Sequence, residues 1–275
     1  MSSSTPGVVV VTGASGGIGA AICRRFAREG WTVVGTSRDA ASAPAPEGVA
    51  MRDLDVADAA SVRSFVHEVL GAHGRVDVLV NNAGIGAVGA AEDTEVEILE
   101  RVLQVNLTGV ARLTRALLPG MRDRGTGRVV NVSSAVGLVP APYMAAYAAS
   151  KHALEGWSVS VDHETREHGV RVLLVEPGYT DTGFDDAVLR PAEATGAYDR
   201  RVEALEAFLT RALRSGDSPE VVAAVVWKAA TGAVWTVRFP AGRLAHVAAA
   251  AHRLAPRPVF DAALRRAIGL PFRPR

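Results

Sequence analysis

The stretch Gly7-Val-Val-Val-Val-Thr-Gly-Ala-Ser-Gly-Gly-Ile-Gly19 decides how the rest of the chain folds. Its four valines form an apolar, β-branched run that predicts a buried strand, and the glycines after it predict a turn. Apolar residues at helical spacing follow from Ala20 to Ala27, so the turn opens into a helix. A glycine-rich turn between a strand and a helix is typical of dinucleotide binding, because the backbone can approach a pyrophosphate and the helix N-terminus faces the phosphates.

Short apolar runs then alternate with helical patterns along the chain. They predict strands at 31–37, 49–54, 76–81, 127–134, 170–175 and 234–239. Continuous apolar runs are typical of parallel strands that are buried on both faces. We therefore expect an α/β fold: a Rossmann-type, doubly wound parallel sheet of about seven strands, with helices on both faces and in a single domain. The expected division is a dinucleotide-binding catalytic domain at 1–242, with a substrate lid near 183–216, and a basic helical extension at 243–275 packed on the same domain.

Helices are predicted at 58–73, 92–121 and 145–168, and another begins at Pro219 after the N-cap Ser218. Asp58 is a good N-cap for the first of them. Asn106 lies in the middle of the second helical pattern, where its side chain can compete for the local backbone. We expect a kink there.

Tyr147-Ala-Ala-Ser-Lys151 carries the candidate chemistry. A spacing of four on a helix puts the phenol and the ammonium on one face, one turn apart. A free phenol has a pKa of about 10, and a fixed positive charge nearby favours the phenolate. We expect Lys151 to lower the pKa of Tyr147, so that the phenol can give a proton to a carbonyl oxygen or take one from an alcohol.

Further motifs follow in a fixed order: Asn81-Asn82-Ala83-Gly84, Asn106, Ser134 after the strand at 127–134, and the loop 177–182. Together with the glycine-rich turn and the Tyr147 motif, they resemble the short-chain dehydrogenase/reductase superfamily in its compact one-domain branch. The resemblance is close over residues 7–183 and loose beyond. Within the superfamily, residues 75–86 and 127–156 are similar to the hydroxysteroid and retinol dehydrogenases.

The resemblance implies roles for individual residues. Tyr147 would be the proton donor or acceptor, Lys151 would also hold the nicotinamide ribose, and Ser134 would hydrogen-bond the substrate oxygen. The thirteen-residue gap to Tyr147 selects Ser134 over Ser133, and Asn106 would maintain a water relay to Lys151. The cofactor-binding residues implied are Gly13, Ser15, Gly17, Ile18, Gly19, Arg38, Asp55, Val56, Asn82, Ala83, Gly84, Tyr147, Lys151, Pro177, Gly178, Thr180 and Thr182.

The choice of cofactor depends on the end of the second predicted strand. NAD-binding proteins commonly carry an acidic residue there that binds the adenosine ribose. Arg38 stands there instead, and a guanidinium can bind a ribose phosphate with two hydrogen bonds. We expect NADP(H), with Ser15 adding a hydroxyl; the alternative is that Arg38 is a solvated residue and Asp39 holds a ribose. Asp55 is open to two interpretations, an adenine contact or a plain helix cap.

The motifs predict an NADP(H)-dependent oxidoreductase that transfers a hydride between nicotinamide and a carbonyl or secondary alcohol. Apolar candidates near the site suggest a hydrophobic ketone, aldehyde, steroid-like or retinoid-like substrate: Val136, Leu138, Val139, Tyr143 and Phe184. A non-catalytic, NADP(H)-sensing regulatory protein is the alternative from another class, although a sensor need not keep all four catalytic residues. Sugar epimerases and dehydratases usually have shorter glycine-rich spacing and a larger C-terminal domain.

Composition limits the partners. The net charge of +1 gives no field that attracts nucleic acid, and no apolar run reaches the ~18 residues of a membrane span. The first residues lack the basic region of a signal peptide, so we expect a cytoplasmic protein. The lone Cys23 is expected to be a buried small hydrophobe. The histidines lack ligand spacing, so no metal site is expected.

Two features point to possible partners. In relatives, the helices corresponding to 101–118 and 145–168 form dimer or four-helix interfaces, which implies a homodimer or homotetramer, although their apolar stripes suit a core equally well. From Arg243 onward the chain is basic, including Arg273 and Arg275, and residues 259–268 stripe one helical face up to Ile268. Such a helix can lie on an anionic membrane, or pack on the domain or a subunit, which we expect.

Overall fold

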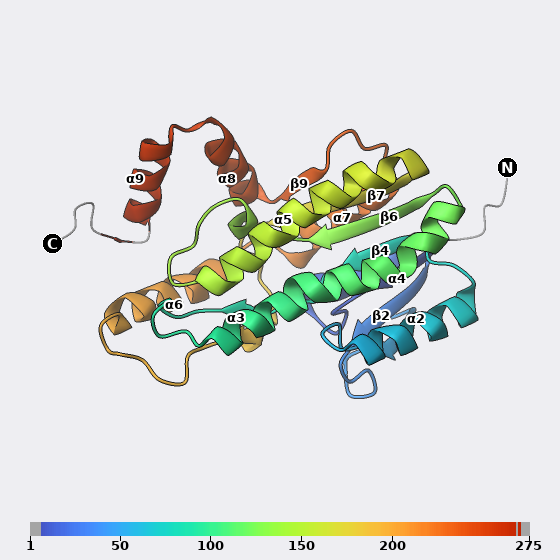
Figure 1. Ribbon diagram of the computed structural model, residues 1–275, viewed down its shortest axis with the longest axis horizontal. Coiled ribbons are helices and arrows are strands. Elements are labelled where there is room, and N and C mark those ends of the chain that lie inside the picture. The colour runs from blue at the N-terminus through green and yellow to red at the C-terminus, as the bar shows by residue number, and fades with distance from the viewer. Residues whose placement is uncertain (1–6, 268, 271–275) are drawn as a thin grey trace.

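The computed structural model describes residues 7–267 and 269–270 (Figure 1). Seven parallel strands form the central sheet in the spatial order β3-β2-β1-β4-β6-β7-β9. Their bounds are β1 Val8–Val11, β2 Thr32–Ser37, β3 Val49–Asp53, β4 Val78–Asn81, β6 Gly127–Val132, β7 Val170–Pro177 and β9 Arg238–Ala241. The strands run outward from β1 in both directions, so the predicted doubly wound sheet is confirmed.

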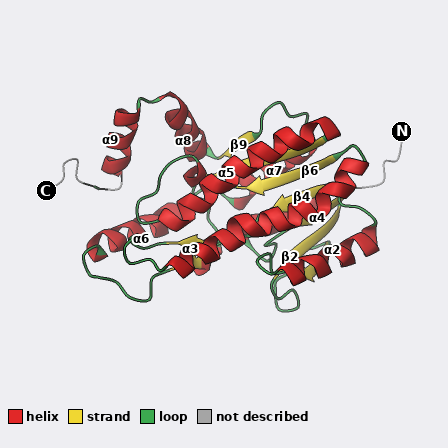
Figure 2. Ribbon diagram, viewed as in Figure 1, coloured by secondary structure: helices red, strands yellow, loops and turns green. Residues whose placement is uncertain are grey.

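Helices cover both faces of this sheet, and each face has its own apolar core (Figure 2). Side chains alternate along β1: Val9 and Val11 contribute to one core and Val10 to the other, as the two-residue period of a strand requires. The first core lies under α1 (Gly17–Arg28) and α7 (Pro219–Thr231). The second lies mainly under α2 (Ala59–His73) and α4 (Val110–Asp123), beside α5 (Ala145–Thr165).

The long helical pattern at 92–121 divides at Asn106. It becomes α3 (Val96–Leu103), a π-helical turn at Gln104–Gly109, and α4. The Asn106 amide bonds the backbone of Ile85 in both directions, with its Nδ2 donating to the Ile85 carbonyl and its Oδ1 accepting from the Ile85 N–H, each at 2.9 Å. The predicted interruption therefore takes the form of a π-bulge, a feature often found at functional sites.

The seventh strand was predicted at 234–239 and lies at Arg238–Ala241 instead. Residues before it are engaged otherwise: the Val234 carbonyl accepts from Arg171 Nη1 at 2.9 Å, and Trp235 is 97% exposed. Pairing with β7 therefore begins only at Arg238, opposite Leu174. The contact with Val234 comes from Arg171, which lies 63 residues away in sequence, so no local pattern contains it.

A second, two-stranded parallel sheet joins β5 (Gly86–Ala87) to β8 (Val188–Leu189). Before β8 comes a 3₁₀ turn, Gly183–Ala187, and after it comes α6 (Asp199–Arg214). The Val88 N–H donates to the Leu189 carbonyl at 3.0 Å, and the Gly89 N–H donates to the Tyr143 carbonyl at 2.9 Å. The region around 183–216 is thus attached by backbone hydrogen bonds to the segment that follows β4.

The basic C-terminal region forms two helices, α8 (Arg243–Leu254) and α9 (Arg257–Ala267), where the sequence pattern suggested a single amphipathic stripe in its last part. Pro256 lies between them and ends helical hydrogen bonding. Ala245 of α8 is buried, while α9 extends away from the sheet (Figure 1). Ile268, Arg273 and Arg275 lie outside the described residues, as does the start of the chain. Within the described ranges, none of the helices combines the length and apolar character needed to cross a bilayer.

Candidate active site

The candidate site lies where β1 and β4 are adjacent but their connections leave in opposite directions, the position at which open α/β sheets bind ligands. Thr12 and Asn82 fasten the two strand ends together. Thr12 Oγ1 accepts from the N–H groups of Asn82 and Ala83, each at 2.9 Å. Asn82 Nδ2 donates back to the carbonyls of Thr12 and Gly13, at 3.0 and 3.1 Å.

The glycine-rich turn requires glycine at defined positions. Gly13 and Gly17 have φ angles of 66° and 51°, in the left-handed region that side chains disfavour. A Cβ on Gly19 would lie 2.0 Å from the Gly13 carbonyl oxygen, so only glycine lets α1 begin this close to β1. These constraints fit the cradle that a nicotinamide dinucleotide needs, with its pyrophosphate at the N-terminus of α1.

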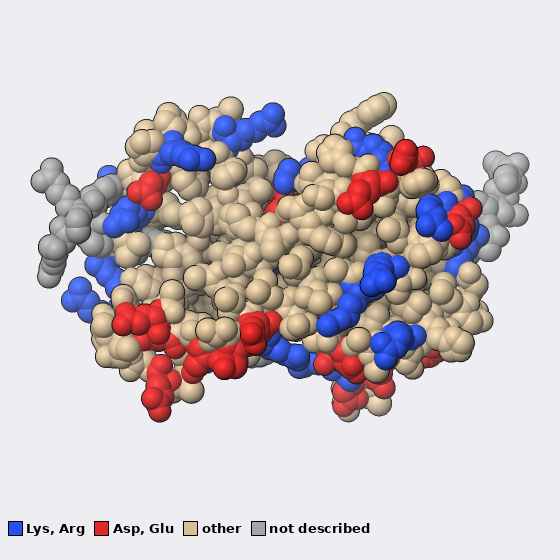
Figure 3. Space-filling model, viewed as in Figure 1, with Lys and Arg blue, Asp and Glu red and all other residues tan. Residues whose placement is uncertain are grey.

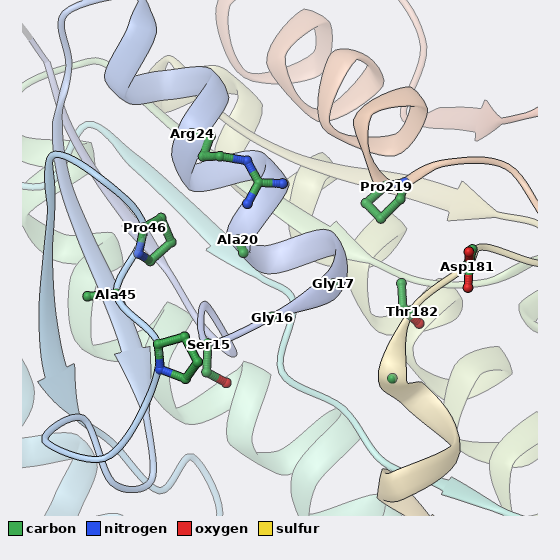
Figure 4. Close-up of a pocket in the computed structure, with 12 residues that line it drawn as sticks. Ser15, Gly16, Gly17, Ala20, Arg24, Ala45, Pro46, Asp181, Thr182 and Pro219 are labelled. Carbon is green, nitrogen blue, oxygen red and sulfur yellow. The ribbon is translucent and has the colours of Figure 1, made fainter.

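A pocket of about 590 Å³ lies beside this turn (Figure 4). Ser15 and Arg24 line it from the turn and from α1, and Thr182 lines it from the loop after β7. Its remaining walls are Gly16, Gly17, Ala20, Pro44, Ala45, Pro46, Asp181, Gly183 and Pro219. A Cβ on Gly17 would lie 3.0 Å from the Thr182 side chain, so Thr182 closes over the turn from the opposite side.

Arg38 follows the last residue of β2 and is exposed. The neighbouring Asp39 is engaged locally: its Oδ1 accepts from the Ser42 N–H at 3.1 Å, and hydrogen bonds from the Ser42 side chain and then the Ser42 backbone lower the pKa of its carboxyl. Asp39, the alternative ligand for a ribose, therefore has a carboxylate oxygen hydrogen-bonded within a turn. Arg38 makes no ion pair or hydrogen bond within residues 7–267 and 269–270.

The other expected cofactor residues lie along the same edge of the sheet. Asp55 Oδ1 accepts from the Ala57 N–H at 2.8 Å, a turn-capping bond, while its Oδ2 lies 3.9 Å from Arg101 Nη2. Val56 is buried against Gly109 of the π-helical turn. Pro177 is the last residue of β7, Gly178 packs near Leu244, and Thr180 is buried and bridges to Asp217.

Tyr147 and Lys151 both lie on the buried side of α5, 9% and 6% exposed. Lys151 Nζ lies 5.8 Å from the centre of the Tyr147 ring and donates to the Val132 carbonyl at 2.9 Å. Ser134 follows β6 and hydrogen-bonds Tyr147, while its Oγ also accepts from the Val136 N–H at 3.2 Å. Three elements thus bring Ser134, Tyr147 and Lys151 to one place.

Burial reverses the direction of the pKa shift that the sequence suggested for the phenol. It raises the pKa of Tyr147 to about 12, against the opposing hydrogen bond from Ser134. Burial also lowers the pKa of Lys151 to about 8, with the charge of Glu155 acting in the other direction. Desolvation is the largest cause of both shifts, because each group loses water that stabilised its charged form.

Asn106 is 1% exposed and is linked through Ser150 to the turn of α5 that carries Tyr147. Its Nδ2 donates to Ser150 Oγ at 3.0 Å, and that hydroxyl donates to the Tyr147 carbonyl at 2.7 Å. The π-helical turn is therefore tied to α5 next to the phenol.

Apolar side chains of the segment 183–209 cover Tyr147. The rings of Phe184 and Tyr147 lie 5.9 Å apart between centroids. The surrounding cluster includes residues from the strand ends and from α6: Val88, Val136, Ala141, Met144, Val188, Val202, Leu205 and Leu209. Phe208 packs edge-on against Tyr179 at 5.8 Å, so it belongs to the packing of α6 rather than to the wall over Tyr147.

Sequence reasoning missed two residues at this site. Thr12 immediately precedes Gly13, and a hydroxyl at the last position before a tight turn is a usable signal for a backbone clamp. Arg24 lines the pocket, but nothing local separates it from the surface arginines around it, and it pairs with Glu220 at 3.1 Å. Cys23 is fully buried, as expected, and burial raises the pKa of its thiol to about 12.

Comparisons with known proteins show the family to which the chain belongs. Residues 7–192 match the family described as short chain dehydrogenase. A 3-ketodihydrosphingosine reductase of Bacteroides thetaiotaomicron is 38% identical over 66% of this chain and 66% of its own length. A Streptomyces virginiae protein named monensin polyketide synthase putative ketoacyl reductase is 37% identical over 82% of this chain and 90% of its own.

Solved structures give the same result. A short-chain dehydrogenase from Streptomyces avermitilis has a TM-score of 0.83 and 34% identity, covering 98% of this chain and 99% of its own. A metagenomic short-chain oxidoreductase in complex with NADP has a TM-score of 0.67 and 31% identity, covering 88% and 100%. A Burkholderia phymatum enzyme in complex with NAD has a TM-score of 0.77 and 28% identity, covering 100% and 99%. Similar folds therefore bind either cofactor.

Proposed function

Because the chain belongs to the short-chain dehydrogenase/reductase family, we propose that it is an NADP(H)-dependent reductase of hydrophobic ketones or aldehydes, working also in reverse on secondary alcohols. One observation carries the proposal: Ser134, Tyr147 and Lys151 converge in a fold whose turn after β1 requires glycine at Gly13, Gly17 and Gly19. The enzyme class follows from the family. The cofactor, the substrate and the residue roles are our inference.

The nicotinamide would supply the hydride. Tyr147 would give its proton to the substrate oxygen, and a phenol that burial keeps protonated is suited to the reducing direction. Ser134 would donate to the same oxygen and stabilise its developing charge. Lys151 would hold the ribose hydroxyls and place its positive charge beside the phenol, and Asn106 would keep α5 in position through Ser150.

We infer that the cofactor residues predicted from the sequence bind different parts of one NADP(H) molecule. Gly13, Ser15, Gly17, Ile18 and Gly19 would bind the pyrophosphate side, with Thr180 and Thr182 facing them after β7. Arg38, and Arg24 from the pocket wall, would bind the ribose phosphate of NADP(H). The engagement of Asp39 with Ser42 supports this preference.

The substrate would be hydrophobic, because apolar residues form the wall over Tyr147. Two relatives carry names that denote reduction of a ketone on a long chain or a ketoacyl group. We propose a carbonyl flanked by a long alkyl chain, with steroid-like and retinoid-like ketones or aldehydes as the next candidates. Residues 183–216 would act as the lid over it.

The regulatory alternative gains no support, because the relatives named above are reductases.

A homodimer or homotetramer and a cytoplasmic location stay predictions. The face in Figure 3 carries its charges mainly toward the edges and is largely uncharged in its centre, near α5, which suits the expected helix-to-helix interface.

The test is a panel of carbonyl compounds with NADPH and with NADH, including long-chain 3-ketones, steroid ketones and retinaldehyde. We expect NADPH oxidation with hydrophobic ketones. Tyr147→Phe should lower kcat by orders of magnitude and leave NADPH binding, measured by fluorescence, nearly unchanged. Retention of full activity by that variant would remove the proposed role of Tyr147, and NADPH binding without turnover of any carbonyl would favour the sensor.

A further inference from the structure

Two buried carboxyl groups lie near Lys151, one on the same helix and one on β7, the strand that packs against that helix. Glu155 is one helical turn after Lys151 on α5 and is 4% exposed, and Glu176, next to the end of β7, is 1% exposed. Gly137 packs on this side of α5: a Cβ there would lie 3.1 Å from Glu155 Cγ and 3.3 Å from the Lys151 carbonyl. The glycine lets the 3₁₀ turn at Ala135–Gly137 close over the pair.

Both carboxyl groups form an ion pair with the same arginine. Arg238, the first residue of β9, places its Nε 2.8 Å from Glu155 Oε2 and 3.5 Å from Glu176 Oε1. Glu155 Oε1 and both oxygens of Glu176 have no hydrogen-bond partner, and Ser133 Oγ nearby has none either. Buried polar atoms without partners are costly, so their gathering in one place calls for an explanation.

Two neighbouring buried carboxylates are not both expected to be ionised at neutral pH. Burial raises the pKa of Glu176 to about 8, the charge of Glu155 adds to this, and Arg238 opposes it. The shorter ion pair favours the negative charge on Glu155. At neutral pH the proton of the pair then resides on Glu176, and Glu155 lies one helical turn from Lys151, which is also buried.

We propose that Glu155 is a positioning residue for the reaction: its carboxylate, one helical turn from the buried Lys151 and paired with Arg238, holds Lys151 in its charged form. The inference rests on the proposed function, because a charged Lys151 matters only if that residue binds the ribose and acts on Tyr147. Without Glu155, burial alone would act on Lys151, and the ammonium would lose its proton at a lower pH.

The charged and titratable groups around Lys151 are few. α5 contributes Tyr147 and Glu155, β7 contributes Glu176, and β9 contributes Arg238. The turn Ala135–Gly137 contributes none, and on α8, which packs against it, Arg243 and His246 are exposed. Arg171 pairs with Asp162 at the opposite end of β7.

The composition makes a direct test simple. The chain contains two lysines, Lys151 and the exposed Lys228 of α7. Uniform labelling of the lysine side chains with ¹³C gives one NMR signal for each ε-carbon, and Lys228→Arg assigns them. The titration midpoint of Lys151 is then read from the folded protein, without cofactor or substrate.

Glu155→Gln keeps the shape and removes the charge, and we expect the Lys151 midpoint to fall by about one pH unit or more. Glu155→Asp, which keeps a carboxylate, should restore most of that fall. Glu176→Gln imitates the protonated acid and should move the midpoint less than Glu155→Gln does. Far-UV circular dichroism and the unfolding midpoint verify that each variant is folded.

The proposal is overturned if Glu155→Gln leaves the Lys151 midpoint unchanged, or if Glu176→Gln lowers it as much. In active enzyme, the alkaline limb of the pH profile of kcat/KM should move with the NMR midpoint. Because the NMR titration needs no turnover, a wrong reaction assignment would appear as missing activity with an intact Lys151 shift. A wrong role for Glu155 would appear as retained activity with a Lys151 midpoint that Glu155→Gln does not move.

Discussion

The Phe184 ring lies 5.9 Å from the Tyr147 ring, tilted by 54°, so an aromatic side chain from the turn before β8 covers the phenol of α5. Burial of the phenol is the first cause of its raised pKa. The acidity of the phenol therefore depends on the closure of a segment more than thirty residues away in sequence.

Phe184→Ala should admit water to Tyr147 and lower its pKa from about 12 toward the ordinary value, because water stabilises the phenolate. Phenolate absorbance during an alkaline titration measures this, and the same titration in Phe184→Ala/Tyr147→Phe identifies which of the four tyrosines moved. KM for a hydrophobic ketone should rise roughly 10-fold. An unchanged Tyr147 midpoint would show that other walls keep the phenol dry.

Arg38→Asp should raise KM for NADPH by roughly 10- to 100-fold, the value of one hydrogen bond to a charged group, and should change KM for NADH far less. Steady-state kinetics with both cofactors measure the ratio. Arg63→Asp, an exposed site on α2, makes the same change in net charge and controls for long-range attraction. Equal losses with both cofactors in Arg38→Asp would contradict the NADP(H) assignment.

Thr12→Val removes the acceptor for the N–H groups of Asn82 and Ala83 without a large change in volume. We expect a loss of about 1 to 3 kcal/mol in the free energy of unfolding and weaker NADPH binding, because the strand end that carries the turn loses its clamp. Urea unfolding and fluorescence titration measure the two effects. Thr12→Ser keeps the hydroxyl and should behave nearly as the parent; equal losses in both variants would point to packing instead.

Glu176 should make the protein less stable as the pH rises. Its folded-state pKa of about 8 exceeds the unfolded value, so its contribution is fully present below about pH 4.5 and is lost as the pH approaches 8. In Glu176→Gln, the decline in unfolding free energy between pH 5 and 8 should shrink, by an amount on the order of 3 to 5 kcal/mol at most. Urea midpoints across this window measure it, with the exposed Glu203→Gln as the matched control. Parallel curves for the parent and Glu176→Gln would rule out ionisation of Glu176.

The alternation of valine runs and helical patterns was sufficient to predict the seven-stranded sheet, because strands buried on both faces have little freedom in composition. The N-cap at Asp58 was predicted for the same kind of reason, since its side chain accepts from Ala60 and Ser61 within the same turn. Local chemistry determines these features.

The features that could not be predicted from the sequence depend on contacts between distant segments. Arg171 engages the Val234 carbonyl just before β9, and the direction of the pKa shift at Tyr147 is set by the residues that bury it. Glu176 looks like an ordinary acid after a strand until the structure places it beside Glu155 and Arg238. Water exclusion at these positions is a property of the assembled chain, which a local pattern does not contain.

The pairing of β5 with β8 affects which substitutions this enzyme can accept in the segment around β8. Main-chain groups of Gly86 and Ala87 hold Val188 and Leu189, and a Cβ on Gly86 would lie 3.1 Å from both the Phe184 ring and the Val188 side chain, so this attachment depends on the main chain and on glycine at position 86. If this segment is the substrate lid that we propose, substitutions of its side chains would change which molecules are accepted while the β5–β8 pairing is kept. Laboratory evolution of new selectivity should begin at residues 184–209.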